Sequence, residues 1–341
     1  MLGRVAGTLF YAAWLGVVAG CWSGSPQQVV VYTALDEEFS APLLERFRQQ
    51  TGVEPLPKYD TESTKTVGLA QAILTQGSRP QCDVFWNNEV LHTLRLHRAG
   101  LLQPLQLPEA ENFPRQYRAG DGSWFGFAAR ARVLIVNKEK LSAEEYPRSI
   151  RDLTDPRWRG QAGMAKPLFG TTATHAACLF AHWGEEKARA FFRQVKQNQV
   201  RILAGNRHVA EEVAAGRLLW GITDTDDAHL ALRAGHPVAV VFPDQEPGGL
   251  GTLLIPNTVC VLRGAPHPEA ARRLVRFLLS PEVERHLARG PSAQIPLNSQ
   301  VKQRPRLPLP EKLRTMPVDF EQAARCWEPS MQFLRELFAG G

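Results

Sequence analysis

Short apolar, β-branched runs alternate with amphipathic helical segments through most of this chain, and no other feature of the sequence limits its fold so strongly. Residues 29–33 predict a first strand, and the helical segment that follows carries an aromatic residue or leucine at every fourth position. Strands are again predicted at 53–59 and 83–86, with a helix between them. This order predicts an α/β sheet that is covered by helices on both faces.

A second set of strands and helices begins near residue 131 and continues to about residue 242. The strand predicted at 253–262 returns to the first set, so the chain crosses between the two sets more than once. A mature chain of roughly 320 residues also exceeds what one hydrophobic core usually supports. We therefore predict two α/β lobes with a hinged ligand cleft between them, lobe 1 formed by residues 29–129 and 255–298 and lobe 2 by 130–254 and 299–341.

The N-terminal segment has the pattern of an export signal. Arg4 precedes a short apolar stretch over residues 5–19, and small residues lead up to Cys21. This pattern predicts a lipoprotein signal peptide at 1–20, a lipid on Cys21 and a polar tether at 21–28. The alternative is an ordinary signal peptide that a cysteine follows by chance. We expect an extracytoplasmic protein, in the periplasm or at the cell surface, that the lipid anchors to a membrane.

Composition excludes several classes of function. The net charge of +6 comes from lysine and arginine residues that are scattered along the sequence, often beside acids, which is typical of a solvated surface. The sequence has no basic block with interleaved aromatic residues, so we expect no nucleic-acid partner. The four cysteines after Cys21 lie far apart without a CxxC spacing, which argues against a zinc site. We expect these four to be free thiols, although disulfides are possible in this compartment.

Ligands of α/β sheets lie beyond the carboxyl ends of the strands, so the loops at these ends supply the candidate site residues. Asn87 and Asn88 fit ligand binding and helix capping equally well. Arg130 lies where the chain first crosses between the lobes and could pair with an anionic ligand or with an acid across the hinge. The complete set of candidates from these positions is Thr33, Asp36, Glu62, Ser63, Asn87, Asn88, Arg130, Thr171, Thr172, Asp224 and Asp226.

Two of these loops have opposite electrostatic preferences. Residues 170–174 place a glycine and hydroxyls at a helix start, where free N–H groups favour an anion, but N-capping by Thr171 or Thr172 explains the same residues. Residues 224–227 hold three carboxylates, which repel one another unless a hard cation or a ligand amine lies among them. Acids in the first turn of a helix also occur without any ligand.

The strand-end loops show no catalytic arrangement. An enzyme on this fold would need a nucleophile with a base, or a cofactor lysine, and these loops offer neither a Ser–His nor a Cys–His pair. We therefore expect a binding protein rather than an enzyme, with no cofactor, and we expect it to be a monomer.

Six short motifs in this order resemble the ferric-iron-binding group of ABC transporter solute-binding proteins, of the extracellular family 1 type. They are VYTA (31–34), DVFW (83–86), ARARV (129–133), DPRWRG (155–160), AGN (204–206) and QIPLN (294–298). The resemblance covers most of the mature chain. It implies a periplasmic-binding-protein fold of type II, a role in iron transport, and an ABC permease and ATPase as partners. It also adds Asn206 to the candidate ligand-binding residues.

The ligand residues of that group match this chain incompletely. Members that hold bare ferric iron use adjacent tyrosines after the strand that here ends at Thr223, and this chain has aspartates there instead. An oxygen cage could still hold a ferric or other hard metal ion, with a bridging anion at Thr171 and Thr172. The alternative ligand is an aminoalkylphosphonate or a phosphorylated metabolite, with its acidic group at the 170–174 helix start. The candidate metal cage consists of Asp36, Glu62, Asp224 and Asp226.

Overall fold

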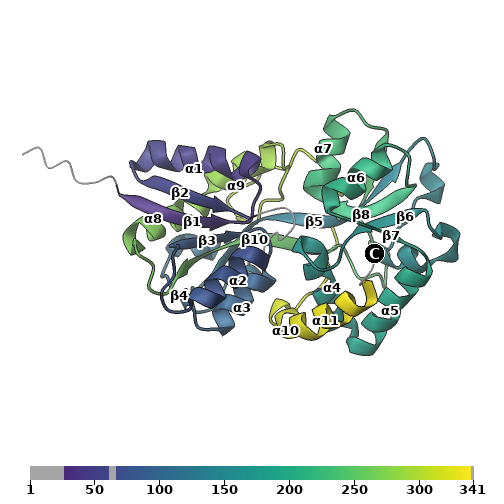
Figure 1. Cartoon of the computed structure of the whole chain (residues 1–341). Helices are drawn as coiled ribbons and strands as arrows, with labels where there is room; N and C mark the ends of the chain where they lie inside the picture. Colours follow the sequence, from purple (N-terminus) through teal and green to yellow (C-terminus); the bar gives the residue numbers. More distant parts are fainter. Residues whose placement is uncertain (1–26, 61–66, 339–341) are drawn as a thin grey trace, which may run out of the picture.

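The computed structural model describes residues 27–60 and 67–338, and Figure 1 shows them as two lobes side by side. The predicted signal peptide, Cys21 and most of the predicted tether lie outside the described residues, as do Glu62 and Ser63. Within the described ranges, no helix is both long enough and apolar enough to cross a membrane.

Lobe 1 is built on a sheet with the strand order β2-β1-β3-β10-β5. β1 is parallel to β2 and β3, whereas β10 is antiparallel to β3. Because β10 follows the strands of lobe 2 in the sequence, the chain returns to this sheet after it has built lobe 2. The strands are β1 (Gln28–Thr33), β2 (Glu54–Tyr59), β3 (Val84–Asn87), β4 (Leu102–Gln103), which pairs with β10, and β10 (Leu254–Leu262). The helices are α1 (Glu37–Thr51), α2 (Val67–Gln76), α3 (Leu91–Arg98), α8 (Pro268–Leu278) and α9 (Pro281–Arg289).

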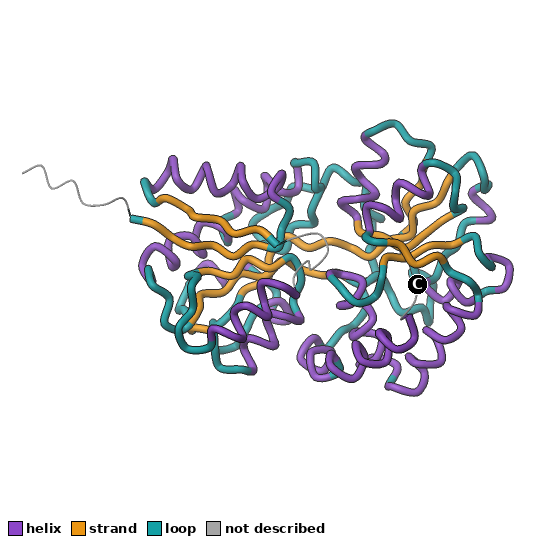
Figure 2. Tube along the Cα trace, in the orientation of Figure 1, coloured by secondary structure: helices purple, strands orange, loops and turns teal. Residues whose placement is uncertain are grey.

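One long strand belongs to both lobes. β5 (Phe125–Asn137) pairs with β10 as far as Ala131 and with β8 from Arg132 onward. Every residue of β5 is buried. Figure 2 shows this strand as the continuous connection between the two sheets.

Lobe 2 continues the sheet in the order β5-β8-β6-β7, with β9 paired to β5. β6 is parallel to β7 and β8, while β5 is antiparallel to β8 and β9. The strands are β6 (Ala162–Ala165), β7 (Arg201–Leu203), β8 (Trp220–Asp224) and β9 (Val238–Val241). The helices are α4 (Gly170–Trp183), α5 (Glu185–Gln197), α6 (Asn206–Ala214) and α7 (Thr225–Arg233).

The C-terminal part of the described chain contacts both lobes. α10 (Phe320–Arg325) packs against α3 of lobe 1 and α4 of lobe 2, and α11 (Trp327–Phe338) packs against α4 and α5. The loops also contain short 3-10 helices, η1 (Pro108–Asn112), η2 (Arg115–Tyr117), η3 (Ala143–Glu145), η4 (Ile150–Thr154) and η5 (Pro156–Trp158). The C-terminal helices therefore join the lobes at a second place, apart from the strand crossing.

The predicted alternation of strands and helices is confirmed. On α1 the side chains at every fourth position, Phe39, Leu43 and Phe47, are all buried, and Gly52 ends the helix with a left-handed backbone (φ 69°) that glycine adopts without strain. The largest difference concerns β5, because the sequence predicts only residues 131–136 as strand. The cysteines of the described chain are free thiols, and all but Cys326 are buried.

Candidate ligand-binding site

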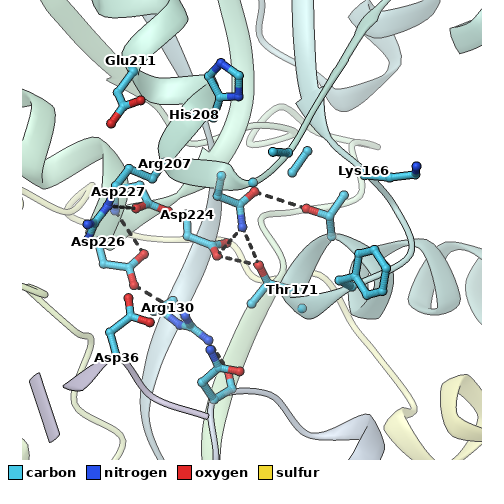
Figure 3. A pocket seen from close by; sticks show the side chains of 18 of the residues that line it. Asp36, Arg130, Lys166, Thr171, Arg207, His208, Glu211, Asp224, Asp226 and Asp227 are labelled. Atoms are coloured by element: carbon cyan, nitrogen blue, oxygen red, sulfur yellow. Dashed lines mark hydrogen bonds and ion pairs between the residues drawn. The ribbon is translucent and has the colours of Figure 1, made fainter. Parts of the chain in front are cut away.

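A cavity of about 530 Å³ lies between the two lobes. A helix start carries unpaired N–H groups and the positive end of the helix dipole, so a wall made of several helix starts favours negative charge. Figure 3 shows that acidic side chains nevertheless gather there beside an arginine. Among the described residues, the helices that begin at this wall are α1 after Asp36, α4 at Gly170, α6 at Asn206 and α7 after Asp224.

Arg132 is the centre of a buried hydrogen-bond network behind this wall. Its guanidinium donates to Asp224 Oδ1 at 2.7 Å and to the hydroxyls of Thr171 and Thr172 at 3.3 and 3.2 Å. The other oxygen of Asp224 accepts from Thr171 at 2.5 Å and from Asn206 at 3.0 Å. The sheet positions the ion pair, because Arg132 on β5 lies directly opposite Asp224 on β8. Both carboxylate oxygens of Asp224 therefore have partners within the chain.

The charge state of this network follows from its arginines. Burial alone would raise the pKa of the Asp224 carboxyl, but the positive charges of Arg132 and Arg130 outweigh burial and hold this pKa below its ordinary value. His175 on α4 is buried beside the network, and its pKa is lowered to about 3, first by burial and then by Arg132. At neutral pH Asp224 is therefore ionised and His175 is neutral.

Arg130 lines the cavity itself, where β5 passes between the lobes. Its guanidinium lies 3.5 Å from Asp226 Oδ2 of lobe 2 and donates to the backbone carbonyl of Asn88 in lobe 1. Arg130 Nε and the side-chain oxygen of Asn88 are both buried without a hydrogen-bond partner among the described residues. Buried polar atoms are rarely left unpaired, and among the described residues that line the cavity Arg130 and Asn88 are the two that carry such an atom.

The acidic loop after β8 brings three carboxylates together. Oxygen atoms of Asp224, Asp226 and Asp227 lie within 4.8 Å of one another, which is close enough to share a cation. However, Asp224 is neutralised by Arg132, and Asp226 pairs with Arg130. The two arginines thus supply positive charge that the sequence analysis attributes to a ligand. A metal ion here would draw its oxygens from Asp226 and Asp227, and Figure 3 places Asp36 of lobe 1 next to them.

Arg207 connects the two lobes at the cavity. From α6 of lobe 2 it donates to Glu38 Oε1 on α1 of lobe 1 at 2.8 Å, and its Nε lies 3.7 Å from Asp227 Oδ1. The hydrogen bond to Glu38 and the nearby acids raise the pKa of Arg207, so this group stays charged. Lys166 and His208 also line the cavity, and Figure 3 shows the Lys166 side chain directed away from the acidic residues.

The structure brings most of the sequence-predicted residues together at this cavity. Thr33 and Asn87 are buried outside its lining, Asn87 donating to Glu89 at 2.6 Å, and Glu62 and Ser63 lie in the undescribed stretch. Arg207 and Lys166 line the cavity but are not among the candidates predicted from the sequence, although Arg207 directly follows the AGN motif. The predicted residues that line the cavity are Asp36, Asn88, Arg130, Thr171, Thr172, Asn206, Asp224 and Asp226.

Comparison with known proteins gives a family and a fold. Residues 88–323 match the family model described as bacterial extracellular solute-binding protein. Iron uptake protein A1 of Synechocystis sp. is 29% identical over 293 residues, which cover 82% of this chain and 79% of that protein.

Solved structures match over almost the whole described chain. Iron-bound HitA from Pseudomonas aeruginosa superposes with a TM-score of 0.82 at 23% identity, covering 92% of this chain and 100% of the other. The periplasmic binding protein AfuA from Actinobacillus pleuropneumoniae, solved with fructose-6-phosphate, gives a TM-score of 0.79 at 22% identity, with coverage of 92% and 99%. This likeness confirms the predicted periplasmic-binding-protein fold of type II.

Proposed function

The chain belongs to the bacterial extracellular solute-binding protein family, and from this premise we propose that it is the binding component of an ABC importer for ferric iron. In this proposal the iron enters the cavity as a complex with a small anion, and the lobes close on it. The loaded protein then delivers the complex to a permease that an ATPase drives. The names of its relatives support the iron, because iron uptake protein A1 and iron-bound HitA are among them.

The mixed charge of the cavity is the observation that carries this proposal. Asp226 and Asp227 offer hard oxygen ligands, while Arg130 and Arg207 offer positive charge to an anion in the same space. A volume of about 530 Å³ lies in the range of small-molecule sites and exceeds what a bare ion needs. An iron complex of a small carboxylate uses both kinds of side chain.

The location proposed for this function is outside the cytoplasm, with lipid on Cys21 as the anchor to a membrane. A short tether of polar residues would then join lobe 1 to this anchor. The absence of a catalytic pair from the strand-end loops supports a transport role rather than an enzymatic one.

A thermal-shift series on residues 22–341 tests the iron proposal. A ligand that binds only the folded state adds about 2.7 kcal/mol at a hundred times its Kd, which raises the Tm. We expect ferric citrate to raise the Tm and citrate alone to raise it much less. The variants Asp226→Asn and Asp227→Asn should reduce the iron-dependent shift, and the exposed control Glu139→Gln should keep it. Equal shifts with citrate and ferric citrate would contradict iron binding.

A phosphorylated small metabolite is the second candidate ligand, and one observation favours it. Among the described residues that line the cavity there is no tyrosine, whereas helix starts at Gly170 and Asn206 and the side chains of Arg130 and Arg207 suit a phosphate group. The structural neighbour with bound fructose-6-phosphate adds support. In the same series, a Tm shift with fructose 6-phosphate and none with ferric citrate would favour this ligand.

A further inference from the structure

The net positive charge of the chain is concentrated in one stretch. Residues 285–314 contain seven lysines and arginines and one acid, Glu311, so this stretch alone carries +6, the net charge of the whole chain. Along the sequence these basic residues are scattered, because up to a dozen other residues separate two neighbours. The fold determines whether they form one surface.

The structure brings the segment around Gln303 and Arg306 against α9 of lobe 1 and places the charge of Arg306 near α7 of lobe 2. The backbone N–H of Arg306 donates to Ala288 O of α9 at 3.1 Å, and Arg289 of α9 donates to Gln303 at 2.7 Å. On the other side, the pKa of His229 on α7 is lowered by burial and then by the positive charges of Arg233 and Arg306. Figure 1 shows the loop after α9 passing between α9 and α7.

We name this region the seam surface, since it covers the junction of the two lobes. Its side chains are all exposed, and within the described chain none of them has a carboxylate within ion-pair distance. Arg314 is not included because its guanidinium is held by the backbone carbonyls of Glu246 and Gly249. The seam surface consists of Arg233, Arg285, Arg289, Lys302, Arg304 and Arg306.

The chemistry of the seam surface indicates its partner. Protein partners usually bury aromatic or aliphatic anchors, and the only exposed large hydrophobic residue of the described chain is Leu56, on β2. A surface with six unpaired cations and no apolar anchor fits a diffuse layer of negative charge. The headgroups of anionic phospholipids form such a layer.

We infer that the seam surface binds the anionic phospholipid headgroups of the membrane to which the chain is anchored. The inference rests on the proposed extracytoplasmic, lipid-anchored location, but not on the identity of the transported ligand. A chain held at residue 21 has only a few residues before β1, and at roughly 3.3 Å per residue this keeps lobe 1, which contains α9, close to the bilayer. Binding through the seam surface would then orient the two lobes on the membrane.

Vesicle binding of residues 22–341, which lack the lipid, tests the inference. We expect the protein to bind vesicles of phosphatidylcholine with 30% phosphatidylglycerol at low salt, and not vesicles of pure phosphatidylcholine. The triple variant Arg289→Gln, Arg304→Gln, Arg306→Gln should bind roughly 100-fold more weakly, because each cation near such a surface contributes about a fivefold factor. A variant with lysine at the same three positions should keep most of the binding.

A second triple variant controls for the loss of charge as such. Arg79→Gln, Arg115→Gln, Arg159→Gln removes three exposed arginines elsewhere and should bind almost as well as the unchanged chain. Equal losses in both triple variants would mean that net charge alone drives adsorption, and they would overturn the inference. No preference for anionic vesicles, or binding to heparin without binding to vesicles, would also overturn it. Iron-dependent Tm shifts, measured on the same variants, report separately on the proposed function.

Discussion

At the residue scale, the acidic loop at 224–227 obtains its positive charge from arginines of the same chain, whereas its sequence predicts a cation from a ligand. Three carboxylates at 224–227 indicate nearby positive charge. Two arginines of β5 supply it, since Arg130 pairs with Asp226 and Arg132 pairs with Asp224. The sequence places these arginines at the crossing between lobes but gives no information on the register between β5 and β8. That register, set by the whole sheet, makes Arg132 and Asp224 direct partners.

The buried pair of Arg132 and Asp224 gives the first prediction. Arg132→Met should lower the free energy of unfolding by about 3–5 kcal/mol, because it leaves the Asp224 carboxylate buried without its cation. The double variant Arg132→Met, Asp224→Asn should recover part of this loss, since no unpaired charge remains. Urea unfolding of the three proteins measures both effects. A loss below 1 kcal/mol in the single variant would show that Asp224 is solvated and not buried as described.

At the residue scale, therefore, the sequence predicts which loops meet but only partly which side chains face the cavity. Asn88 lines it while its neighbour Asn87 is buried against Glu89, a difference that depends on how β3 ends. Arg207 reaches the cavity only because α6 begins at Asn206, although the first buried apolar residue of this helix is Val209. Polar first turns carry no hydrophobic signal, so their helical state is hard to predict from periodicity.

At the scale of elements, the sequence predicts the strands that long apolar runs form, but it predicts only part of the central strand β5. The first half of β5 contains glycine and several alanines, which have low strand propensity, and it forms a strand because β10 pairs with it. Tertiary pairing therefore decides the secondary structure at the place where the lobes join. The helices α8 and α9 both begin with a proline, whose fixed φ fits the first helical position and whose missing N–H leaves no bond unmade there.

The contact between α3 and α11 gives a prediction about pH. The ring of His92 lies 4.5 Å from that of Trp327, and its Nδ1 lies 2.9 Å from an Arg95 nitrogen. A guanidinium only donates, so Nδ1 accepts and the imidazole is neutral. Its pKa is lowered to about 4, above all by burial. The unfolded chain takes up this proton below its ordinary pKa of 6.5, so the stability that neutral His92 contributes is complete above pH 6.5 and is lost as pH falls towards 4.

The measurement is the free energy of unfolding between pH 7 and pH 4.5. We expect it to fall by up to about 1.4 kcal/mol per pH unit for each buried neutral histidine. His92→Gln should reduce this slope, and the exposed control His236→Gln should leave it unchanged. If both variants keep the full slope, His92 does not titrate as described, and buried His175 becomes the next residue to replace.

At the scale of the whole molecule, the two lobes meet through contacts of different strength. β5 joins them covalently, α10 packs on both, and the ion pair of Arg207 with Glu38 crosses between α6 and α1. The side chains of this pair are 50% and 51% exposed, so we expect it to affect the relative position of the lobes more than the stability of either one.

This pair gives the third prediction. Glu38→Gln should change the free energy of unfolding by less than about 1 kcal/mol, yet it should shift the lobes towards a more open arrangement with a larger radius of gyration in X-ray scattering. Glu45→Gln breaks the Arg48 pair within α1, which has similar exposure but does not cross between lobes, and it should leave the scattering unchanged. High salt should abolish the difference, because it screens exposed pairs. Identical scattering of both variants at low salt would contradict the prediction.

The return of β10 to the first sheet also determines when the molecule can fold. Cys260 of β10 contacts Phe85 of β3, although they are 175 positions apart in the chain. Lobe 1 therefore cannot complete its sheet until three quarters of the polypeptide has been synthesised, and pairing over such a separation is slow because a long loop must first close. The strands of lobe 2 all lie within residues 125–241, so the sheet of lobe 2 can form before β10 exists. The strand order thus imposes an order of assembly on the molecule, in which the lobe that begins first along the chain is completed last.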